Sequence, residues 1–437
     1  MKSKIFFLLK WVLVLVGLGS THCARSPIKN PGQAMRVAKA SPPQIVDDMR
    51  LEGLKEALQK TRLALRKKPV DLQFGPTTVT AENYILVLDD LVKKLAKMGG
   101  GEEFATYLAE HFDLYEVYGG DRWGEVFITS YFEPILEGRK HKTGRFSQAL
   151  YATPKDLVEI RWGQFVETLP QLSDLSGKVF EQKSRQSVLR GRLVAEVGQM
   201  PYVVPYFDRA EIDLQQRLEK YPGLVLAWVD PVDAFFMHIQ GSGTIQWPNG
   251  KKTRLGYASQ NGYPYVPIGR FLLDAIPLEN MSLQSIESHI RSRSPEEVQF
   301  ILNKNPSYVF FRKLTGDAET FMGAEVTSGR TIATDYSLYP KGGLALLQYE
   351  KPVFSTDDTL APQRWETSMR LVVDQDTGGA IRGPHRVDLY WGKGDAAKQM
   401  AGVMRHSGQL HYFVPRKSYI AELQPSKPLN SGAGADK

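Results

Sequence analysis

Apolar residues recur at helical spacing in the segment that follows residue 45. The first run predicts a helix over about residues 47–67, and the second predicts a helix that begins after Thr80 as N-cap and ends at the glycines 99–101. A third helix is predicted over residues 102–112. The positions that share a face in the first two helices are Leu51, Leu54, Leu58 and Leu65, then Tyr84, Ile85, Leu88, Leu91, Val92 and Leu95.

After residue 120 the pattern changes to aromatic and β-branched residues, which are typical of strands. A helical interlude over about residues 268–304 interrupts it, and Ser294 followed by Pro295 favours a helix start there. Many short strands with few helices predict a mainly β protein, with β-barrel-like domains and helical additions. The predicted strands lie at 123–134, 223–229, 234–240, 263–267, 308–311, 371–373, 387–390 and 410–414.

The first residues have the pattern of a secretion signal. Lys2, Lys4 and Lys10 precede an apolar run over residues 11–18, which is shorter than the roughly 20 residues that span a bilayer. Cys23, the one cysteine of the chain, follows the run, so no intramolecular disulfide is possible. Its position resembles a bacterial lipoprotein signal, although His22 departs from the usual small residue. We predict lipidation at Cys23, and a plain signal peptide cut near the same place is the alternative.

Charge and composition narrow the class of partner. The chain has 437 residues, enough for two or three domains, and carries a formal net charge of +7. Basic residues are scattered and no nucleic-acid motif accompanies them, which favours an anionic polymer such as cell-wall glycan with acidic peptides over a nucleic acid. The eight histidines are dispersed without metal-ligand spacing, and no Gly-x-Ser-x-Gly motif occurs. We therefore predict no metal and no cofactor.

Two carboxylates, Asp376 and Asp388, flank a glycine-rich turn. Cleaving a glycosidic bond requires a carboxylic acid with a raised pKa, and the apolar neighbours of Asp388 suit that role. The simpler interpretations are that Asp388 caps a turn and that Asp376 forms an Asx-turn. We expect the two side chains to stand at neighbouring strand ends and face one cleft. The glycines that permit this turn are Gly378, Gly379 and Gly383.

Three further clusters combine polar side chains with aromatic residues or glycines. The first lies on the strand 123–134, whose aromatic residues are more often part of a core than of a sugar site. The second lies at residues 238–244, where glycines permit close approach of a ligand. The third surrounds an Asn-Gly turn, which a plain hairpin also explains. The candidate ligand-binding residues are Thr129, Tyr131 and Glu133, then Gln240 and Ser242, then Tyr257, Asn261 and Tyr265.

In order along the chain, these clusters resemble the membrane-bound lytic murein transglycosylase A family. The resemblance covers about residues 120–415, and several independent motifs occur in the family's order. Ser130, Phe132 and Gln260 depart from the residues that the family usually carries there. The matching segments are 127–134, 209–213, 227–230, 235–243, 256–258, 261–262, 268–270, 305–311 and 374–392.

The resemblance implies a double-psi β-barrel domain, a smaller inserted β-domain, and a substrate groove between them. The C-terminal part of the barrel resembles the so-called 3D domain. The implied division is a signal peptide at 1–22, a flexible tether at 23–44, the first part of the barrel domain with its helices at 45–135, the insert at 136–322, the second part of the barrel at 323–417 and a disordered tail at 418–437.

The activity that the resemblance implies is cleavage of the β-1,4 bond between N-acetylmuramic acid and N-acetylglucosamine in peptidoglycan, with formation of a 1,6-anhydro ring. By motif position Asp388 is the catalytic acid and then base, and Asp376 supports it. The sugar contacts would come from the three clusters above and from Gly378 and Gly379. The implied location is the periplasm, with a lipid anchor in the outer membrane and possible cell-wall synthesis or hydrolysis complexes as partners. A hydrolase that uses water in the same cleft, or a non-catalytic glycan-binding protein, is the alternative.

Overall fold

The fold is described from a computed structural model. The structure describes residues 28, 30–39, 45–172, 188–316, 319–355, 361–378 and 381–425. The predicted signal segment and Cys23 lie outside these residues, so their roles stay predictions. Within the described residues, no helix is both long and apolar enough to cross a membrane.

The centre of the protein is a closed β-barrel of six strands. The order around the barrel is β19, β16, β17, β15, β18 and β5, and β5 pairs with β19 to close it. Most neighbours are antiparallel, whereas β15 with β17 and β18 with β5 are parallel. The predicted barrel is thereby confirmed. Its strands are β5 (Glu125–Glu133), β15 (Thr331–Ala333), β16 (Leu344–Val353), β17 (Arg364–Asp376), β18 (Arg386–Lys393) and β19 (Arg405–Pro415).

Two further strands extend the barrel sheet beyond β19: β4 (Phe112–Val117) and then β1 (Met35–Val37). β1 belongs to the segment that the sequence predicts as a flexible tether, so this part of the prediction is wrong. Met35 is buried, and the three residues of β1 form an antiparallel ladder with β4. Backbone pairing with an open sheet edge gives order to a segment whose composition offers few apolar side chains.

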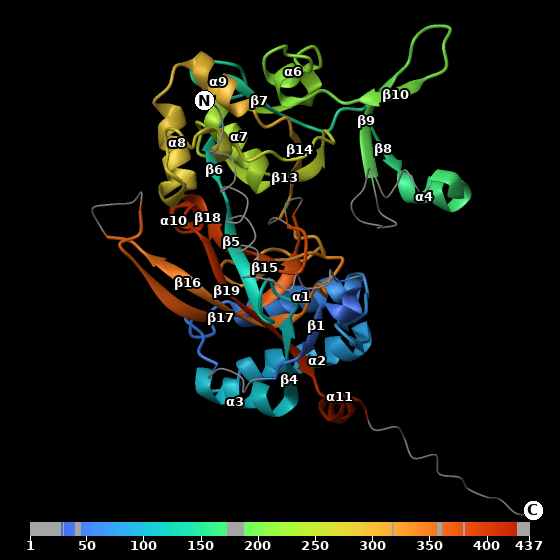
Figure 1. The fold of residues 1–437 in the computed structure, drawn as a ribbon, viewed down its shortest axis with the longest axis vertical. Coiled ribbons are helices and arrows are strands. Elements are labelled where there is room, and N and C mark those ends of the chain that lie inside the picture. The colour runs from blue at the N-terminus through green and yellow to red at the C-terminus, as the bar shows by residue number, and fades with distance from the viewer. Residues whose placement is uncertain are drawn as a thin grey trace, which may run out of the picture.

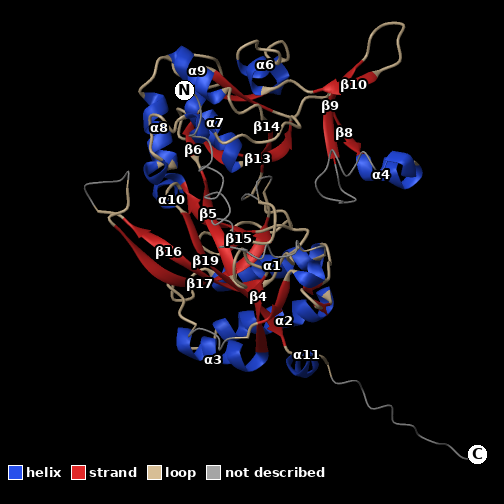
Figure 2. Cartoon of the chain, in the orientation of Figure 1, coloured by secondary structure: helices blue, strands red, loops and turns tan. Residues whose placement is uncertain are grey.

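The predicted N-terminal helices pack against the barrel (Figures 1 and 2). Thr80 accepts a hydrogen bond from the Asn83 amide and begins α2 as predicted. Tyr84 and Leu88 of α2 share one apolar core with barrel residues such as Leu346. The helical region comprises α1 (Leu54–Lys67), α2 (Ala81–Leu95) and α3 (Gly101–His111), with the hairpin β2 (Leu72–Phe74) and β3 (Thr77–Val79) between the first two.

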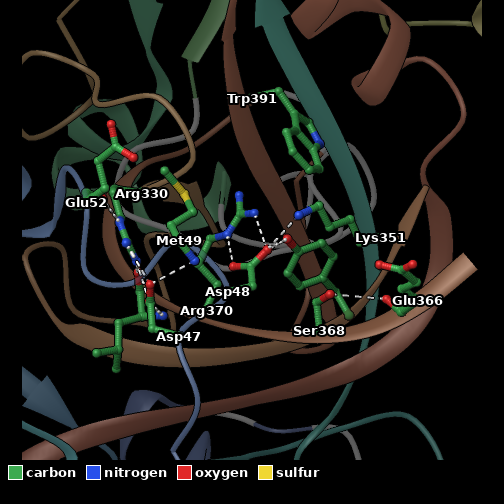
Figure 3. Close-up of polar contacts among 12 residues, drawn as sticks. Asp47, Asp48, Met49, Glu52, Arg330, Lys351, Glu366, Ser368, Arg370 and Trp391 are labelled. Atoms are coloured by element: carbon green, nitrogen blue, oxygen red, sulfur yellow. Dashed lines mark hydrogen bonds and ion pairs between the residues drawn. The ribbon is translucent and has the colours of Figure 1, made fainter. Parts of the chain in front are cut away.

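Two aspartates attach the segment before α1 to the outside of the barrel (Figure 3). Asp47 forms an ion pair with Arg330 in which both side chains are at most 2% exposed, and it also accepts a hydrogen bond from the Leu371 amide. Asp48 accepts two hydrogen bonds from Arg370, at 2.6 and 2.7 Å. Burial opposes the charge on Asp48, but the Arg370 guanidinium offsets it, so the pKa of Asp48 falls below its ordinary value.

A second body lies between β5 and β15 in the chain and has cores of its own (Figure 1). Its main sheet has the order β14, β13, β12, β6, and a pair and a three-stranded sheet accompany it. The strands are β6 (Ile135–Glu137), β7 (Gln148–Tyr151), β8 (Leu157–Arg161), β9 (Val188–Val194), β10 (Tyr202–Pro205), β11 (Val225–Val229), β12 (Gly243–Gln246), β13 (Lys252–Gln260) and β14 (Val309–Leu314). The helices are α4 (Trp162–Thr168), α6 (Arg209–Asp213), α7 (Pro231–Gln240), α8 (Leu283–Arg291) and α9 (Pro295–Leu302). The boundaries predicted at 136 and 322 stay a prediction.

Two predicted strands in this body are wrong. Residues 234–240 belong to helix α7, and residues 263–267 form no strand. The Asp230 carboxylate caps α7 by accepting hydrogen bonds from the amides of Val232 and Asp233, and Pro231 occupies the first turn. The aromatic composition favoured a strand, but the capping residues at 230 and 231 decided the conformation. By contrast, Ser294 and Pro295 begin α9 as predicted, with a full capping box.

The C-terminal part of the chain adds α10 (Gly394–Ala401) and α11 (Lys417–Leu423). Helix α11 lies where the sequence predicts the start of a disordered tail, so that boundary is wrong by several residues. Tyr419 explains the difference, because it is buried and packs against Phe112 and Tyr107. Buried Tyr419, together with half-buried Ile420 and Leu423, therefore anchors the helix to the main core.

Candidate functional site

Asp388 and Asp376 lie on opposite sides of the short strand β15. Asp388 of β18 and Asp376 of β17 both pair with Ala333. The two carboxylates are therefore close, although their strands are not neighbours as the sequence predicted, because β15 lies between them. On its other side Asp388 pairs with Thr129 of β5. Thr129 therefore lies next to Asp388, and Tyr131 of the same strand reaches Asp376 through a hydrogen bond from its hydroxyl.

Asp388 carries a carboxyl oxygen without a hydrogen-bond partner. Its Oδ1 atom is buried and finds no partner among the described residues, while the side chain as a whole is 19% exposed. Burial raises the pKa of Asp388 to about 6; the Arg386 guanidinium, 4.0 Å from Oδ1, lowers it and the charge of Asp376 raises it further. A carboxyl group of this kind can hold a proton near neutral pH and deliver it.

The carboxylate of Asp376 is, by contrast, fully engaged. Its Oδ1 accepts hydrogen bonds from the amides of Phe321 and Thr377, at 3.0 and 2.9 Å, and its Oδ2 accepts one from the Tyr131 hydroxyl at 3.0 Å. Burial raises the pKa of Asp376, and these three hydrogen bonds act against that rise. Asp376 is therefore held in place as an acceptor, whereas Asp388 keeps an oxygen free.

The turn between the two aspartates is attached to residues that follow β15. Gly383 has φ of +85°, a conformation that favours glycine, and its amide donates a hydrogen bond to Asp335 Oδ2 at 2.8 Å. Close by, the Tyr339 hydroxyl donates a hydrogen bond to the carbonyl of Pro384. Gly378 begins the turn, and Gly379 lies outside the described residues. The part of the turn at Gly383 and Pro384 is thus held by hydrogen bonds with Asp335 and Tyr339.

The residues of β5 divide between the site and the interior. Thr129 accepts a hydrogen bond from Arg386 at 3.0 Å, and the Tyr131 ring lies against Tyr390 with centroids 5.1 Å apart. Glu133, farther along the strand, is 1% exposed and accepts a hydrogen bond from Thr244 Oγ1 at 2.7 Å. Thr129 and Tyr131 therefore lie beside the two aspartates, whereas Glu133 connects β5 to β12 of the inserted body.

The other predicted ligand-binding residues come from the inserted body. Gln240 accepts a hydrogen bond from the Phe132 amide through its side-chain oxygen, at 3.0 Å, and half-buried Ser242 follows the end of α7. Tyr257 and Tyr265 are 45% and 41% exposed. Asn261 is 1% exposed, and its side-chain amide donates to two backbone carbonyls, so contact with a ligand would require this network to open.

Two family models match the chain. The MltA specific insert domain matches residues 127–312, and the 3D domain matches residues 330–414, so that together they cover more than half of the 437 residues. The chain belongs to the MltA family.

The sequences of MltA family proteins align with this chain over about two thirds of their length. Membrane-bound lytic murein transglycosylase A of Escherichia coli (strain K12) is 29% identical over 303 residues, 68% of each chain. Its homolog from Buchnera aphidicola subsp. Schizaphis graminum is 29% identical over 300 residues, again 68% of each chain. The fold matches the membrane-bound lytic murein transglycosylase structure from Agrobacterium tumefaciens with a TM-score of 0.66, at 24% identity, over 90% of this chain and all of the other.

A structure of E. coli MltA with bound chitohexaose matches with a TM-score of 0.63, at 22% identity, over 91% of this chain and 98% of the other. The likeness extends across both the barrel and the inserted body, since the matched shares leave little of either chain out. The predicted barrel with an inserted body is thus confirmed for this chain, and its fold is that of the MltA structures.

Two of the departures from the MltA pattern have local explanations. The Ser130 hydroxyl donates a hydrogen bond to the carbonyl of Ala401, and the Phe132 ring is buried against Ala397 and Ala401. Both side chains therefore fasten β5 to α10 and do not lie beside Asp388.

Sequence reasoning missed Arg386 and Phe321. Arg386 lies two residues before Asp388 on the same strand, and that spacing alone places both on one face. Phe321 takes part through its backbone amide, which donates to a carboxylate 55 residues away in the chain and leaves no mark in the sequence pattern. Among the described residues, no cluster of histidine, cysteine, aspartate and glutamate is arranged to hold a metal ion.

Proposed function

We propose that this protein is a lytic transglycosylase that cleaves the β-1,4 bond between N-acetylmuramic acid and N-acetylglucosamine in peptidoglycan. Membership of the MltA family supports the reaction class. The observation that carries the residue assignment is the free, buried oxygen of Asp388 in a carboxyl group whose pKa is raised to about 6. Asp388 is the catalytic acid and then base.

The proposed reaction needs one carboxyl group and no added water. Protonated Asp388 gives its proton to the glycosidic oxygen, and the bond from that oxygen to the anomeric carbon of the muramic acid breaks. The resulting carboxylate then accepts the proton of the sugar's C6 hydroxyl as this oxygen bonds to the anomeric carbon. Asp388 is restored and a 1,6-anhydro ring is formed. An internal nucleophile acts at an effective concentration on the order of 10⁵ M or more, so an enzyme nucleophile is not required.

The contacts of Asp376 support a single acid over a pair of carboxylates with divided roles. In a glycosidase of the two-carboxylate type, the second group attacks the sugar or activates water through a free oxygen. Both oxygens of Asp376 are instead occupied by Tyr131, Phe321 and Thr377. We assign to Asp376 the role of stabilising positive charge that develops on the sugar ring.

Product analysis tests the reaction class. Purified protein that digests peptidoglycan is expected to release fragments with anhydromuramic acid ends, which borohydride does not reduce. A hydrolase in the same site would release reducible ends that are heavier by one water. Mass spectrometry before and after borohydride treatment distinguishes the two outcomes, and a predominance of reducible ends would replace our proposal with the hydrolase.

The activity is expected to decrease as pH rises through about 6. Asp388 must be protonated to act first as an acid, and its pKa is about 6, so kcat/KM should fall by about tenfold for each pH unit above that value. Arg386 lowers this pKa, so Arg386→Gln should move the decrease to higher pH. The measurement is kcat/KM on purified glycan strands from pH 4 to 9. A decrease at the same pH in both proteins would show that another group controls it.

We also propose that the protein acts in the periplasm, attached to the outer membrane through a lipid on Cys23. The position of Cys23 after an apolar segment supports this location. Glycan strands of peptidoglycan are the proposed partner, with cell-wall synthesis or hydrolysis complexes as further ones. Labelling cells with radioactive palmitate tests the anchor, because the Cys23→Ala variant should take up no label and the unaltered chain should.

A further inference from the structure

Phe321, Tyr336 and Arg382 form a stack at the edge of the site. The rings of Phe321 and Tyr336 lie 4.9 Å apart with an interplanar angle of 29°, and the Arg382 guanidinium lies 5.5 Å from the centroid of the Tyr336 ring. The Phe321 side chain is 55% exposed. Phe321 is therefore not a core residue. Its large apolar ring lies at the surface and is held there by stacking on Tyr336.

The stack adjoins the proposed catalytic site through the backbone. The Phe321 amide donates a hydrogen bond to Asp376 Oδ1, and Tyr131 binds the other oxygen of the same carboxylate. Arg382 belongs to the turn that joins the two aspartate strands. The residue that carries the exposed ring therefore lies directly beside Asp376.

Beyond Phe321 the surface is hollowed. Phe321 and Tyr336 line a pocket of about 220 Å³, whose lining also includes Leu65 near the end of α1 and Lys68 and Gln73 after it. This volume is below the roughly 300–1,000 Å³ of sites for drug-sized ligands, and it suits one sugar unit more than two. Lys68 is exposed at the rim, as is Arg382 beside the stack.

We propose that this pocket is an additional subsite for one N-acetylated sugar of the glycan strand, beyond the unit that contacts Asp376. The inference rests on the proposed function. A sugar ring presents an apolar face of C–H groups and an edge of hydroxyl and acetamido groups. The Phe321 ring matches the face, and Lys68 in the pocket lining is a long donor that matches the edge. Glycan length is therefore recognised on the side of Asp376.

Binding of oligosaccharides of two lengths tests the subsite. Chitohexaose and chitotriose carry no peptide, and calorimetry on the Asp388→Asn background measures their affinities while turnover is blocked. Adding Phe321→Ala is expected to weaken chitohexaose binding by about tenfold and to leave chitotriose binding within about twofold. The substitution keeps the backbone amide that Asp376 accepts from. Phe321→Trp should restore the affinity, because it restores a stacking ring.

Phe300→Ala is the matched control. Phe300 is a similarly exposed phenylalanine on α9, at 64% against 55% for Phe321, with the Lys304 ammonium 3.9 Å from its ring centroid. Its removal should change neither affinity. The subsite is refuted if Phe321→Ala binds both sugars as its parent does, or if both affinities fall equally. It is also refuted if the parent protein binds only peptide-bearing glycan, since the pocket would then hold the stem peptide. Product analysis of the wild-type chain decides the proposed function separately.

Discussion

Replacing Asp388 by asparagine is expected to lower the turnover of peptidoglycan by about 10²–10⁴-fold. Asparagine has the size of aspartate but cannot deliver a proton or accept one as a carboxylate. The Oδ1 atom of Asp388 accepts no hydrogen bond, and its ion pair with the Arg386 guanidinium is long, at 4.0 Å, so the folded state should be retained. Turnover is measured by release of soluble fragments from purified peptidoglycan, and folding by circular dichroism and the melting temperature.

Glycan binding should persist in this variant, because the residues around Asp388 are unchanged. Asp274→Asn is the control: Asp274 is an exposed aspartate in the inserted body, and its replacement should leave turnover unaltered. Should Asp388→Asn keep the activity of the unaltered chain, Asp388 is neither the acid nor the base. Loss of both turnover and glycan binding would instead assign Asp388 to holding the sugar.

The second large effect concerns stability: Asp47→Ala should lower the free energy of unfolding by about 3–5 kcal/mol. The substitution leaves the guanidinium of Arg330, which is 0% exposed, without its carboxylate partner. It also removes the acceptor of the Leu371 amide in barrel strand β17. An uncompensated charge in the interior costs far more than the loss of an exposed ion pair. Urea denaturation of the two proteins measures the difference.

Asp113→Ala supplies the comparison, since it breaks the exposed ion pair with Arg416, whose side chains are 49% and 42% exposed. That change should cost about 1 kcal/mol or less. In the double variant Asp47→Ala/Arg330→Met the loss should be smaller than the sum of the two single losses, because no charge remains buried. Equal small losses for Asp47→Ala and Asp113→Ala would contradict a structural role for the buried pair.

The sequence predicts those parts of the fold that local patterns determine. The apolar spacing of α2 and its cap Thr80 lie within a few residues of one another, so the helix and its start follow from the sequence. Helix α7 differs, because its aromatic run predicts a strand, whereas the capping residues Asp230 and Pro231 just before the run begin a helix. The order of strands in the barrel depends on contacts between distant segments and has no local signal. The position of β15 between the two aspartate strands was therefore not predictable.

The candidate site divides in the same way. The apolar neighbours of Asp388 point to a raised pKa, and the structure gives the physical cause as burial. The difference between Asp388 and Asp376 could not be predicted, because it depends on hydrogen bonds from Tyr131 and from the Phe321 backbone, both far away in the chain. Residue types identify which groups can take part, whereas distant partners decide which of them keeps a free oxygen.

The most direct test of a single acid that needs no water is digestion of peptidoglycan in water enriched in heavy oxygen. The proposed mechanism transfers the C6 oxygen of the sugar to the anomeric carbon, so the new ends should contain no heavy oxygen by mass spectrometry. If each cleavage instead adds one heavy oxygen to the anomeric carbon, water is the nucleophile and the proposed role of Asp388 as a sole acid and base in an intramolecular reaction is wrong.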